Sequence, residues 1–445
     1  MASEWARVCV ADLEARGILH VEDGNHGEYR PRPEEFSTSG TAFIRAADMS
    51  KGRVLFETAS RISDQALRRI RKGIGAGGDV LISHKGTVGK VAYVPLDAPN
   101  FVCSPQTTFW RSLDQEELDR RYLYYFLCSG GFQLQLATRK GETDMADYVS
   151  LTNQRLLSVL VPPIDDQRAI ANVLGALDDK IVLSQRISET LEAIARALFE
   201  SWFVDFNPVR DKAEGREPDL PKEVADLFPD SLEESGLGEI PRGWGVGKVE
   251  DLGWLSREGL SPSDFPEDIF AHFSIPAFDA NRTPRLEKGG AIKSHKFIVQ
   301  QNAVLFSKLN PRIPRIWLPE VTNSKRAICS TEFLVVLPRM GIPREFLYCL
   351  FASKAFSNVF GTLVTGTSGS HQRVKPEGLL AMETVLPSLP VICQFAHEVR
   401  PLLMRVNRAL DESHIIASLR DTLLPKLFAG DLRVYDAGRT IERHA

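Results

Sequence analysis

Few residues in this sequence have the types and spacing that catalysis requires. The glycine-rich stretch Gly73-Ile-Gly-Ala-Gly-Gly78 resembles a phosphate-binding loop, but it precedes an apolar strand pattern, whereas such loops follow a strand and open a helix. A tight turn before Val80 is the better interpretation. We find no Walker loop ending in Gly-Lys-Ser/Thr, no nucleophile elbow and no nuclease-like cluster of carboxylates with lysine. The sequence therefore favours a protein that binds its target and leaves the chemistry to another catalyst.

Metal and redox chemistry find no support in the spacing of cysteine and histidine. None of the six cysteines forms a Cys-x-x-Cys pair, and none of the nine histidines stands four residues from another. We expect reduced thiols, no metal site and no cofactor held by this chain.

Polar side chains suited to hydrogen bonding with nucleic acid stand in short segments of each half of the chain. Arg and Lys can pair with guanine and Asn or Gln with adenine, while phosphate contacts carry no sequence information. One such segment follows an apolar strand pattern, and a second precedes a proline turn. The candidate DNA-binding residues are His84, Lys85, Thr87 and Lys90 in the first half, and Lys308, Asn310, Arg312, Arg315, His371, Gln372, Arg373 and Lys375 in the second. An ordinary solvated surface is the alternative for each single residue.

The elements that position these segments occur twice. The apolar strand pattern Val80-Leu-Ile-Ser83 recurs as Val304-Leu-Phe-Ser307, and the offset from Val80 to Val304 also relates Arg121 to Glu345 in two similar helical patterns. Trp5 and Trp244 are each followed seven residues later by Asp-Leu. A repeat of this length predicts two related globular units.

A long helical pattern follows each proline turn. A single offset, that from Ile170 to Val399, relates the predicted packing positions, which are Ile170, Leu174, Leu177, Ile181, Ile187, Ile194 and Leu198 in the first copy and Val399, Leu403, Val406, Leu410, Ile416, Leu423 and Leu427 in the second. Both patterns slip in phase near Ser184 and Ser413. A stripe of this length requires a partner, so we predict two antiparallel, coiled-coil-like helices of about 45–50 Å related by a pseudo-two-fold axis. Packing of each helix on its own globular unit is the alternative.

The predicted fold class is α+β, with two globular α/β units separated by the two long helices. We expect the first globular unit at residues 1–160, a helical spacer at 161–206, an ordered connector at 207–243, the second globular unit at 244–386, and a helix with a tail at 387–445.

Composition limits the possible locations and partners. The net charge is −4, which argues against nucleic-acid binding over the whole surface but leaves room for local basic faces. No apolar run is long enough to cross a membrane, and the N-terminus lacks an apolar signal core. We therefore expect a cytoplasmic protein.

Longer motifs resemble a known family. The central region reads Val161-Pro-Pro-Ile-Asp-Asp-Gln167, then Ala197-Leu-Phe-Glu-Ser-Trp-Phe-Val-Asp-Phe206, then Gly238-Glu-Ile-Pro-Arg-Gly-Trp244. Together with Thr422-Leu-Leu-Pro-Lys-Leu-Phe-Ala-Gly-Asp-Leu432, these segments resemble the conserved regions of type I restriction-modification specificity subunits. Ser83–Gly89 and Ser307–Arg312 resemble segments of that family's target recognition domains. The resemblance spans essentially the whole chain.

The resemblance implies a non-catalytic DNA-recognition subunit from a bacterium or archaeon. Two target recognition domains would each read one half of a split DNA site, and their divergence implies an asymmetric site. Two methylation subunits, carrying S-adenosylmethionine and the adenine N6 chemistry, would dock on the conserved regions, and two motor-nuclease subunits could join them. A protein–protein scaffold with a coiled-coil spacer and no DNA is the main alternative, and a self-sufficient methyltransferase-nuclease is a third reading.

Overall fold

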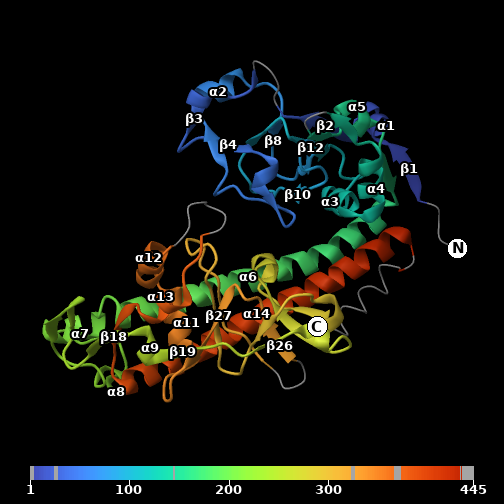
Figure 1. The fold of residues 1–445 in the computed structure, drawn as a ribbon. Coiled ribbons are helices and arrows are strands. Elements are labelled where there is room, and N and C mark those ends of the chain that lie inside the picture. Colours follow the sequence, from blue (N-terminus) through green and yellow to red (C-terminus); the bar gives the residue numbers. More distant parts are fainter. Residues whose placement is uncertain are drawn as a thin grey trace. The chain divides into compact units, whose positions relative to one another are not determined.

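The chain forms two compact units in the computed structural model, which describes residues 5–24, 29–143, 146–321, 326–364, 372–430 and 432. The first unit comprises residues 1–180 and 416–445, and the second comprises residues 181–415. Each unit contains one α/β module and one end of each of two long helices (Figure 1). These compact units therefore divide the chain within the helices, whereas the sequence-based segments placed each helix in a segment of its own.

The first module is built around two larger sheets, to which the strand pairs β1-β15 and β13-β14 are added. A six-stranded sheet has the order β2-β12-β9-β10-β6-β5, and a five-stranded sheet has the order β3-β7-β4-β11-β8. Its elements are β1 (Ala6–Cys9), α1 (Val10–Ala15), β2 (Leu19–Asp23), β3 (Phe36–Ser37), β4 (Thr41–Ile44), β5 (Met49–Ser50), β6 (Arg53–Val54), β7 (Ser60–Ile62), α2 (Asp64–Arg69), β8 (Ile74–Gly75), β9 (Val80–Ser83), β10 (Val91–Tyr93), β11 (Phe101–Cys103), β12 (Thr107–Ser112), α3 (Arg120–Cys128), α4 (Gly130–Thr138), β13 (Gly141–Thr143), β14 (Ala146–Tyr148), α5 (Leu151–Arg155) and β15 (Ser158–Val161). All four residues of β9 are buried, as its continuous apolar pattern predicts.

The second module repeats this plan with fewer strands. Its larger sheets have the orders β19-β27-β24-β25 and β20-β23-β26-β21-β22, and β18 pairs with β28. Its elements are β18 (Gly245–Lys248), α9 (Val249–Leu252), β19 (Gly253–Ser256), β20 (Gly259–Leu260), β21 (Ile269–Phe273), α10 (Ile275–Asn281), β22 (Arg285–Lys288), β23 (Lys296–Ile298), β24 (Val304–Ser307), β25 (Ile316–Trp317), β26 (Arg326–Cys329), β27 (Phe333–Pro338), α11 (Arg344–Ala352), α12 (Lys354–Thr362), α13 (Pro376–Leu380) and β28 (Glu383–Leu386). Before it, the connector folds as α7 (Asn207–Ala213), α8 (Lys222–Ala225) and a hairpin of β16 (Leu232–Ser235) and β17 (Gly238–Pro241).

Equivalent strands and caps confirm that the two modules share one architecture. A parallel pair places Cys103 of β11 beside Ile44 of β4, and the second module places Cys329 of β26 beside Phe273 of β21 in the same way. A serine also caps the N-terminus of an equivalent helix in each module: Ser129 caps α4 in the first, and Ser353 caps α12 in the second. A serine hydroxyl at this position accepts a backbone N–H that would otherwise lack a partner, so the chain turns into the helix at the same point twice.

Two long helices run antiparallel inside each unit. Helix α6 (Ile164–Phe203) has 40 residues and α14 (Leu389–Ala429) has 41, so each is about 60 Å long, which exceeds the predicted length of about 45–50 Å. In the first unit Asp178 Oδ1 accepts a hydrogen bond from Arg420 Nη1 (2.6 Å), and in the second Ser184 Oγ donates to Glu412 Oε2 (3.4 Å). As the residue number increases along α6, the number of its partner in α14 decreases, so the helices are antiparallel. The predicted α+β class with two modules and two antiparallel helices is confirmed.

The helix-packing positions differ in part from the predicted ones. Most of them are buried or half-buried, but Ile194 is 48% exposed, and the buried position beside it belongs to Ala195. The prediction for Ile194 is therefore wrong. At the phase slip, the buried residues are small, namely Ser184, Ser188, Ala409 and Ser413, because helices in close contact leave room only for short side chains.

The repeat offset of the helices is also corrected by the structure. Strand β15 begins at Ser158 and β28 at Glu383, and the same offset separates the first residues of the two helices, Ile164 and Leu389. At this offset the buried Gln167 corresponds to Ile392, which is buried as well. The predicted offset, which aligned Ile170 with Val399, is one helical turn too long. A stripe with a repeat near 3.6 residues per turn looks almost the same after a displacement of one turn.

No helix in the described part of the chain is long and apolar enough to cross a membrane.

Candidate nucleic-acid interface

The two polar segments predicted separately in each half are joined into one loop pair in the structure. In the first module, residues 84–90 contact residues 146–149: Gly86 N–H donates to Asp147 O (3.0 Å), and Val149 N–H donates to His84 O (2.9 Å). In the second, residues 308–315 contact residues 372–374: Asn310 N–H donates to Gln372 O (2.9 Å), and Val374 N–H donates to Lys308 O (3.0 Å). We call these the first and second loop pairs.

Both loop pairs contain a residue with a left-handed backbone conformation at the same position. Gly86 and Asn310 occupy equivalent positions in the bond pattern, and both have a left-handed backbone, with φ of 78° and 49°. Glycine and asparagine tolerate this conformation better than other residues do. A β carbon at Gly86 would meet nothing within 4 Å, so backbone conformation, and not crowding, favours glycine there.

The predicted residues of the first loop pair have different environments. Lys85 and Thr87 are exposed, and the Lys85 ammonium lies 6.0 Å from the centre of the Tyr148 ring. His84 is only 1% exposed, so its predicted role as a direct contact is corrected to a structural one. The Lys90 ammonium donates to the carbonyls of Ala46 (2.9 Å) and Met49 (3.3 Å), which ties it to the module.

A buried polar chain holds His84 in place. Its Nδ1 contacts Thr108 Oγ1, which also accepts a hydrogen bond from Gln154 Nε2 (3.1 Å). Gln154 Oε1 in turn accepts the indole N–H of Trp110 (3.1 Å). Hydrogen-bonded polar groups of this kind rigidify a core, so the strand end that carries the first loop pair is fixed.

The three arginines of the second loop pair have three different environments. Arg315 is 8% exposed and forms a two-bonded ion pair with Asp279 (2.6 and 2.9 Å), so its prediction as a DNA contact is also corrected to a structural role. Arg373 is exposed but holds Glu332 with two hydrogen bonds (3.0 and 2.9 Å). Arg312 is exposed and has no ion pair among the described residues.

The remaining predicted residues of the second module lie around the same loops. Lys308, Asn310 and Gln372 are half-buried, and Lys375 is exposed at the start of α13. His371 lies outside the described residues.

Two residues of the loop pairs were not predicted from the sequence. Tyr148 packs against His84, with ring centres 5.5 Å apart, and burial raises the pKa of its hydroxyl, which stays a hydrogen-bond donor at neutral pH. Ile313 follows Arg312 and is 57% exposed. The sequence did contain a signal for Ile313, which is an apolar residue between two prolines in an otherwise basic stretch. For Tyr148 we find no such signal in the sequence.

Half-buried carboxylates of α6 anchor the modules to the long helices. In the first unit Asp178 accepts hydrogen bonds from Tyr125 Oη (2.7 Å) and from Arg420. In the second unit Glu192 contacts Tyr348 Oη (3.0 Å) and the Arg282 guanidinium (2.6 Å). Burial raises the pKa of both tyrosines, so their hydroxyls remain protonated donors.

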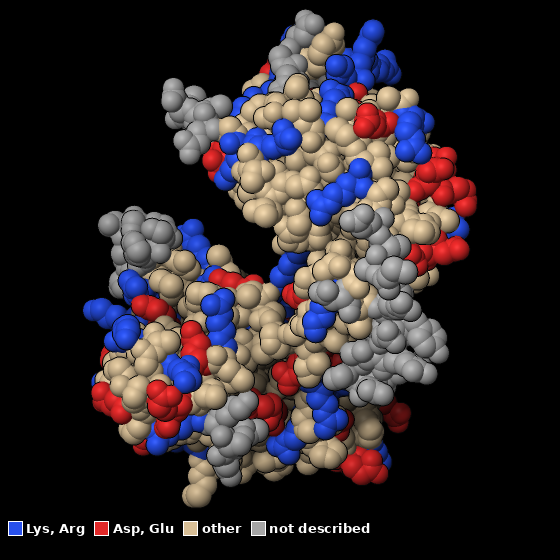
Figure 2. Space-filling model, turned by 90° about the vertical axis from the view of Figure 1, so that its right-hand side faces the viewer, with Lys and Arg blue, Asp and Glu red and all other residues tan. Residues whose placement is uncertain are grey.

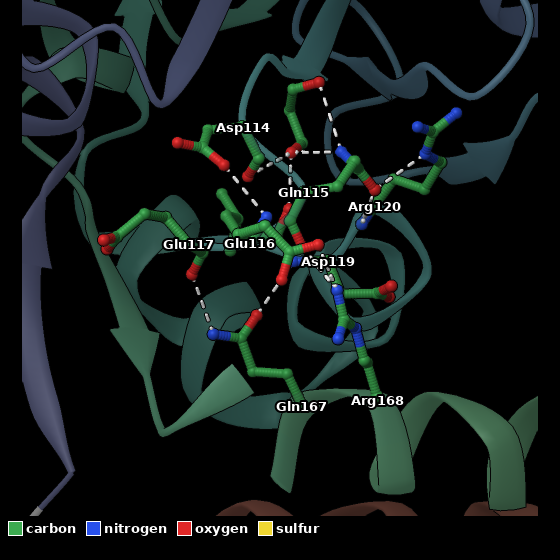
Figure 3. A network of polar contacts seen from close by, with 10 residues as sticks. Asp114, Gln115, Glu116, Glu117, Asp119, Arg120, Gln167 and Arg168 are labelled. Carbon is green, nitrogen blue, oxygen red and sulfur yellow. Dashed lines mark hydrogen bonds and ion pairs between the residues drawn. The ribbon is translucent and has the colours of Figure 1, made fainter. Parts of the chain in front are cut away.

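The start of α6 is attached to the first module by a further polar network (Figure 3). The buried Gln167 side chain donates to Glu117 O (3.0 Å) and accepts from the backbone N–H of Asp119 (3.0 Å), while Arg168 contacts Glu116 (2.7 Å). Gln167 ends the Val161–Gln167 motif singled out in the sequence, and its amide matches both a donor and an acceptor of the same loop.

Positive charge is dispersed and not collected in one basic patch on the face drawn in Figure 2. Lys and Arg side chains alternate there with Asp and Glu. This agrees with the net charge of −4 and favours a few local cationic contacts at loops over a broad basic surface.

Comparison with known proteins identifies relatives over the whole chain. A family described as the type I restriction modification DNA specificity domain matches residues 17–193. The type I restriction enzyme HindI specificity subunit of Haemophilus influenzae is 26% identical, with 97% of this chain and 100% of the relative covered. The MjaIX specificity subunit of Methanocaldococcus jannaschii is 24% identical over 84% of this chain and 82% of its own length. The crystal structure of a type I S subunit from M. genitalium shares the fold, with a TM-score of 0.55, 14% identity and coverage of 95% and 96%.

Proposed function

We infer that this chain, a relative of the type I restriction-modification specificity subunits, is the DNA-recognition subunit of such a system. The family predicted from its motifs is confirmed by the family match and by relatives that align along its length. In our proposal each α/β module reads one half of a split, asymmetric DNA site.

The observation that carries this proposal is the loop pair present in both modules. The same hydrogen-bond pattern fixes residues 84–90 on 146–149 and residues 308–315 on 372–374, although the side chains differ. Exposed cations stand on each loop pair or directly after it, among them Lys85 in the first and Arg312 and Lys375 in the second. A constant scaffold with divergent exposed side chains is the arrangement that two different half-sites require, because phosphate contacts position a protein and base contacts specify.

The partners follow from the same proposal. Two methylation subunits would dock on the long helices and supply S-adenosylmethionine and the adenine N6 chemistry, and two motor-nuclease subunits could join them. This chain would place the DNA and hold no cofactor of its own.

The test is the methylation pattern that the chain directs. The chain is expressed with the methylation subunit of its own system in a host lacking adenine methylation, and N6-methyladenine is mapped across the genome. We expect one split motif with two unequal halves, and no methylation from either subunit alone. A motif without an unread spacer, or methylation that does not depend on this chain, would contradict the proposal.

A further inference from the structure

The tip of the second loop pair exposes an apolar side chain from a rigid turn. Ile313 stands between Pro311–Arg312 and Pro314, and 57% of it is exposed. Its N–H donates to Asn310 O (2.9 Å), which closes a tight turn that has Pro311 and Arg312 at its centre and Ile313 as its last residue. The equivalent tip of the first loop pair carries no such side chain, since Thr87 is polar and Val88 is half-buried.

Several independent contacts immobilise this turn. Ser307 N–H donates to Arg315 O (2.9 Å), and the buried Arg315 guanidinium is held by Asp279 and also donates to Ile313 O (3.5 Å). The proline rings fix φ at Pro311 and Pro314. An exposed side chain on a turn this rigid loses little conformational entropy when a ligand covers it, so the turn is pre-organised for binding.

The charges around Ile313 indicate which ligand fits. Lys308, Arg312 and Lys375 all belong to this loop pair or follow it directly, and none of them has an ion pair within the described ranges. A ligand for this tip must therefore combine negative charge with a small apolar group. A DNA major groove offers both, because phosphates flank it and the 5-methyl group of thymine is its one apolar feature.

We propose that Ile313 is a specificity-determining residue that reads a thymine methyl group in the half-site of the second module. Arg312 beside it supplies the phosphate or guanine contact that holds the tip in the groove. This inference rests on the proposed function and deepens it, since it names one base feature that the second module selects.

Deoxyuridine tests the contact directly, because it differs from thymidine only in lacking that methyl group. Duplexes carrying the mapped motif are prepared with each half-site thymine replaced singly by deoxyuridine, and the Kd of the complex of this chain with its methylation subunits is measured. We expect one replacement to weaken binding by about fourfold, the effect of losing one buried methyl group. In Ile313→Ala the thymine and deoxyuridine duplexes should bind equally.

Ile269→Ala is the matched control. Ile269 is 52% exposed in the same module but starts β21, whereas the loop pair lies beyond the opposite end of that strand, near Phe273 and Ser330. This variant should keep the wild-type preference for thymine. An Ile313→Ala complex that still distinguishes thymine from deoxyuridine at every position, or a wild-type complex indifferent to all replacements, overturns the inference. A wild-type complex without any sequence preference would instead contradict the proposed function.

Discussion

Arg312 and Arg315 are three residues apart but have different tasks. Arg315 is buried against Asp279, so its charge serves the fold, while Arg312 is exposed and available to a ligand. Lys85 and Lys90 are both exposed, but they differ in their partners, because the Lys90 ammonium is bound to two backbone carbonyls. At the scale of single residues, the type of a side chain defines the roles that it can have, and its partners decide which of those roles it has.

Arg312→Ala should weaken DNA binding by the assembled enzyme without unfolding it. The loss should be about 1–3 kcal/mol if the guanidinium pairs with guanine. If it contacts phosphate, the slope of log K against the logarithm of the salt concentration should become smaller in magnitude by about 1, where K is the DNA-binding constant. A salt series measured by fluorescence anisotropy checks both. Arg339→Ala is the control, because Arg339 is exposed after the far end of β27; equal binding by both variants and wild type would contradict the prediction.

Asp279→Ala should destabilise the second unit. It leaves the buried Arg315 charge without its carboxylate, and because Asp279 is itself half-exposed we expect a loss of about 2 kcal/mol, below the range for fully buried pairs. Chemical denaturation measures this loss. Arg312→Ala should stay within about 0.5 kcal/mol of wild type, as surface substitutions generally do. Equal stability of the two variants would show that the pair contributes little.

His272 should make the second unit less stable at mildly acidic pH. Burial lowers the pKa of His272 below its ordinary value of 6.5; Glu287, which contacts Nδ1 at 2.6 Å, opposes this shift, and Lys296 and Arg285 add to it. The unfolded chain therefore binds a proton near pH 6.5 that the folded chain does not yet bind, so stability falls as the pH drops below that value.

The measurement compares denaturation midpoints at about pH 7.5 and about pH 5.5 in wild type and His272→Gln. The wild-type midpoint should fall further than that of the variant, whose amide does not titrate. Parallel pH dependences in the two proteins would be evidence against this role of His272.

At the scale of elements, α6 is the helix to which both modules are attached. It provides Asp178 to Tyr125 in the first unit and Glu192 to Tyr348 in the second. The α3 and α11 helices carry these tyrosines, and their second residues bind equivalent points of the two long helices with opposite charge: Arg121 donates to Gly175 O of α6, whereas Glu345 accepts from Arg400 of α14. The duplication has thus kept the position of the attachment and changed its chemistry.

Glu192→Ala should loosen the second module on α6. Arg282 is largely buried and would lose its carboxylate, and Tyr348 would lose its acceptor, so we expect a loss of about 3 kcal/mol. Backbone hydrogen exchange in α11 should become faster, and chemical denaturation should show the lower free energy of unfolding. Glu189, exposed on the same helix, provides the control, and Glu189→Ala should remain near wild type. Unchanged exchange in α11 would argue that the anchor lies elsewhere.

At the scale of the whole molecule, the two long helices belong to both compact units. The division falls between Lys180 and Ile181 in α6 and between Ile415 and Ile416 in α14. Contacts on either side, such as Asp178 with Arg420 and Ser184 with Glu412, stay within one unit. Any change in the length of one helix must therefore be matched in the other.

Matched heptad insertions after Lys180 and after Ile415 should lengthen the unread spacer of the DNA site. Seven residues add about 10 Å to each helix, close to three base pairs. Methylation mapping should show both half-sites unchanged and a longer spacer. A heptad inserted after Ser188 alone should fail to fold properly, because it separates the Ser184 and Glu192 contacts inside the second unit. An unchanged spacer in the matched variant would contradict the prediction that the length of the helices sets the spacer.

The sequence by itself determined those features that depend on local pattern. The buried strands β9 and β24, the two long helices, the duplication and the family were all predicted, because apolar periodicity and motif order are properties of neighbouring residues.

Only the tertiary structure decided which residues meet across the chain. Neither the pairing of the buried Arg315 with the distant Asp279 nor the joining of residues 84–90 to 146–149 leaves a local signal. The helices illustrate the same limit. Periodicity predicted their apolar stripe but could not distinguish the true repeat offset from one that is a helical turn longer, nor Ala195 from Ile194 at the interface. One turn of displacement preserves the stripe, and only contact with α14 and the modules selects the residue that fits.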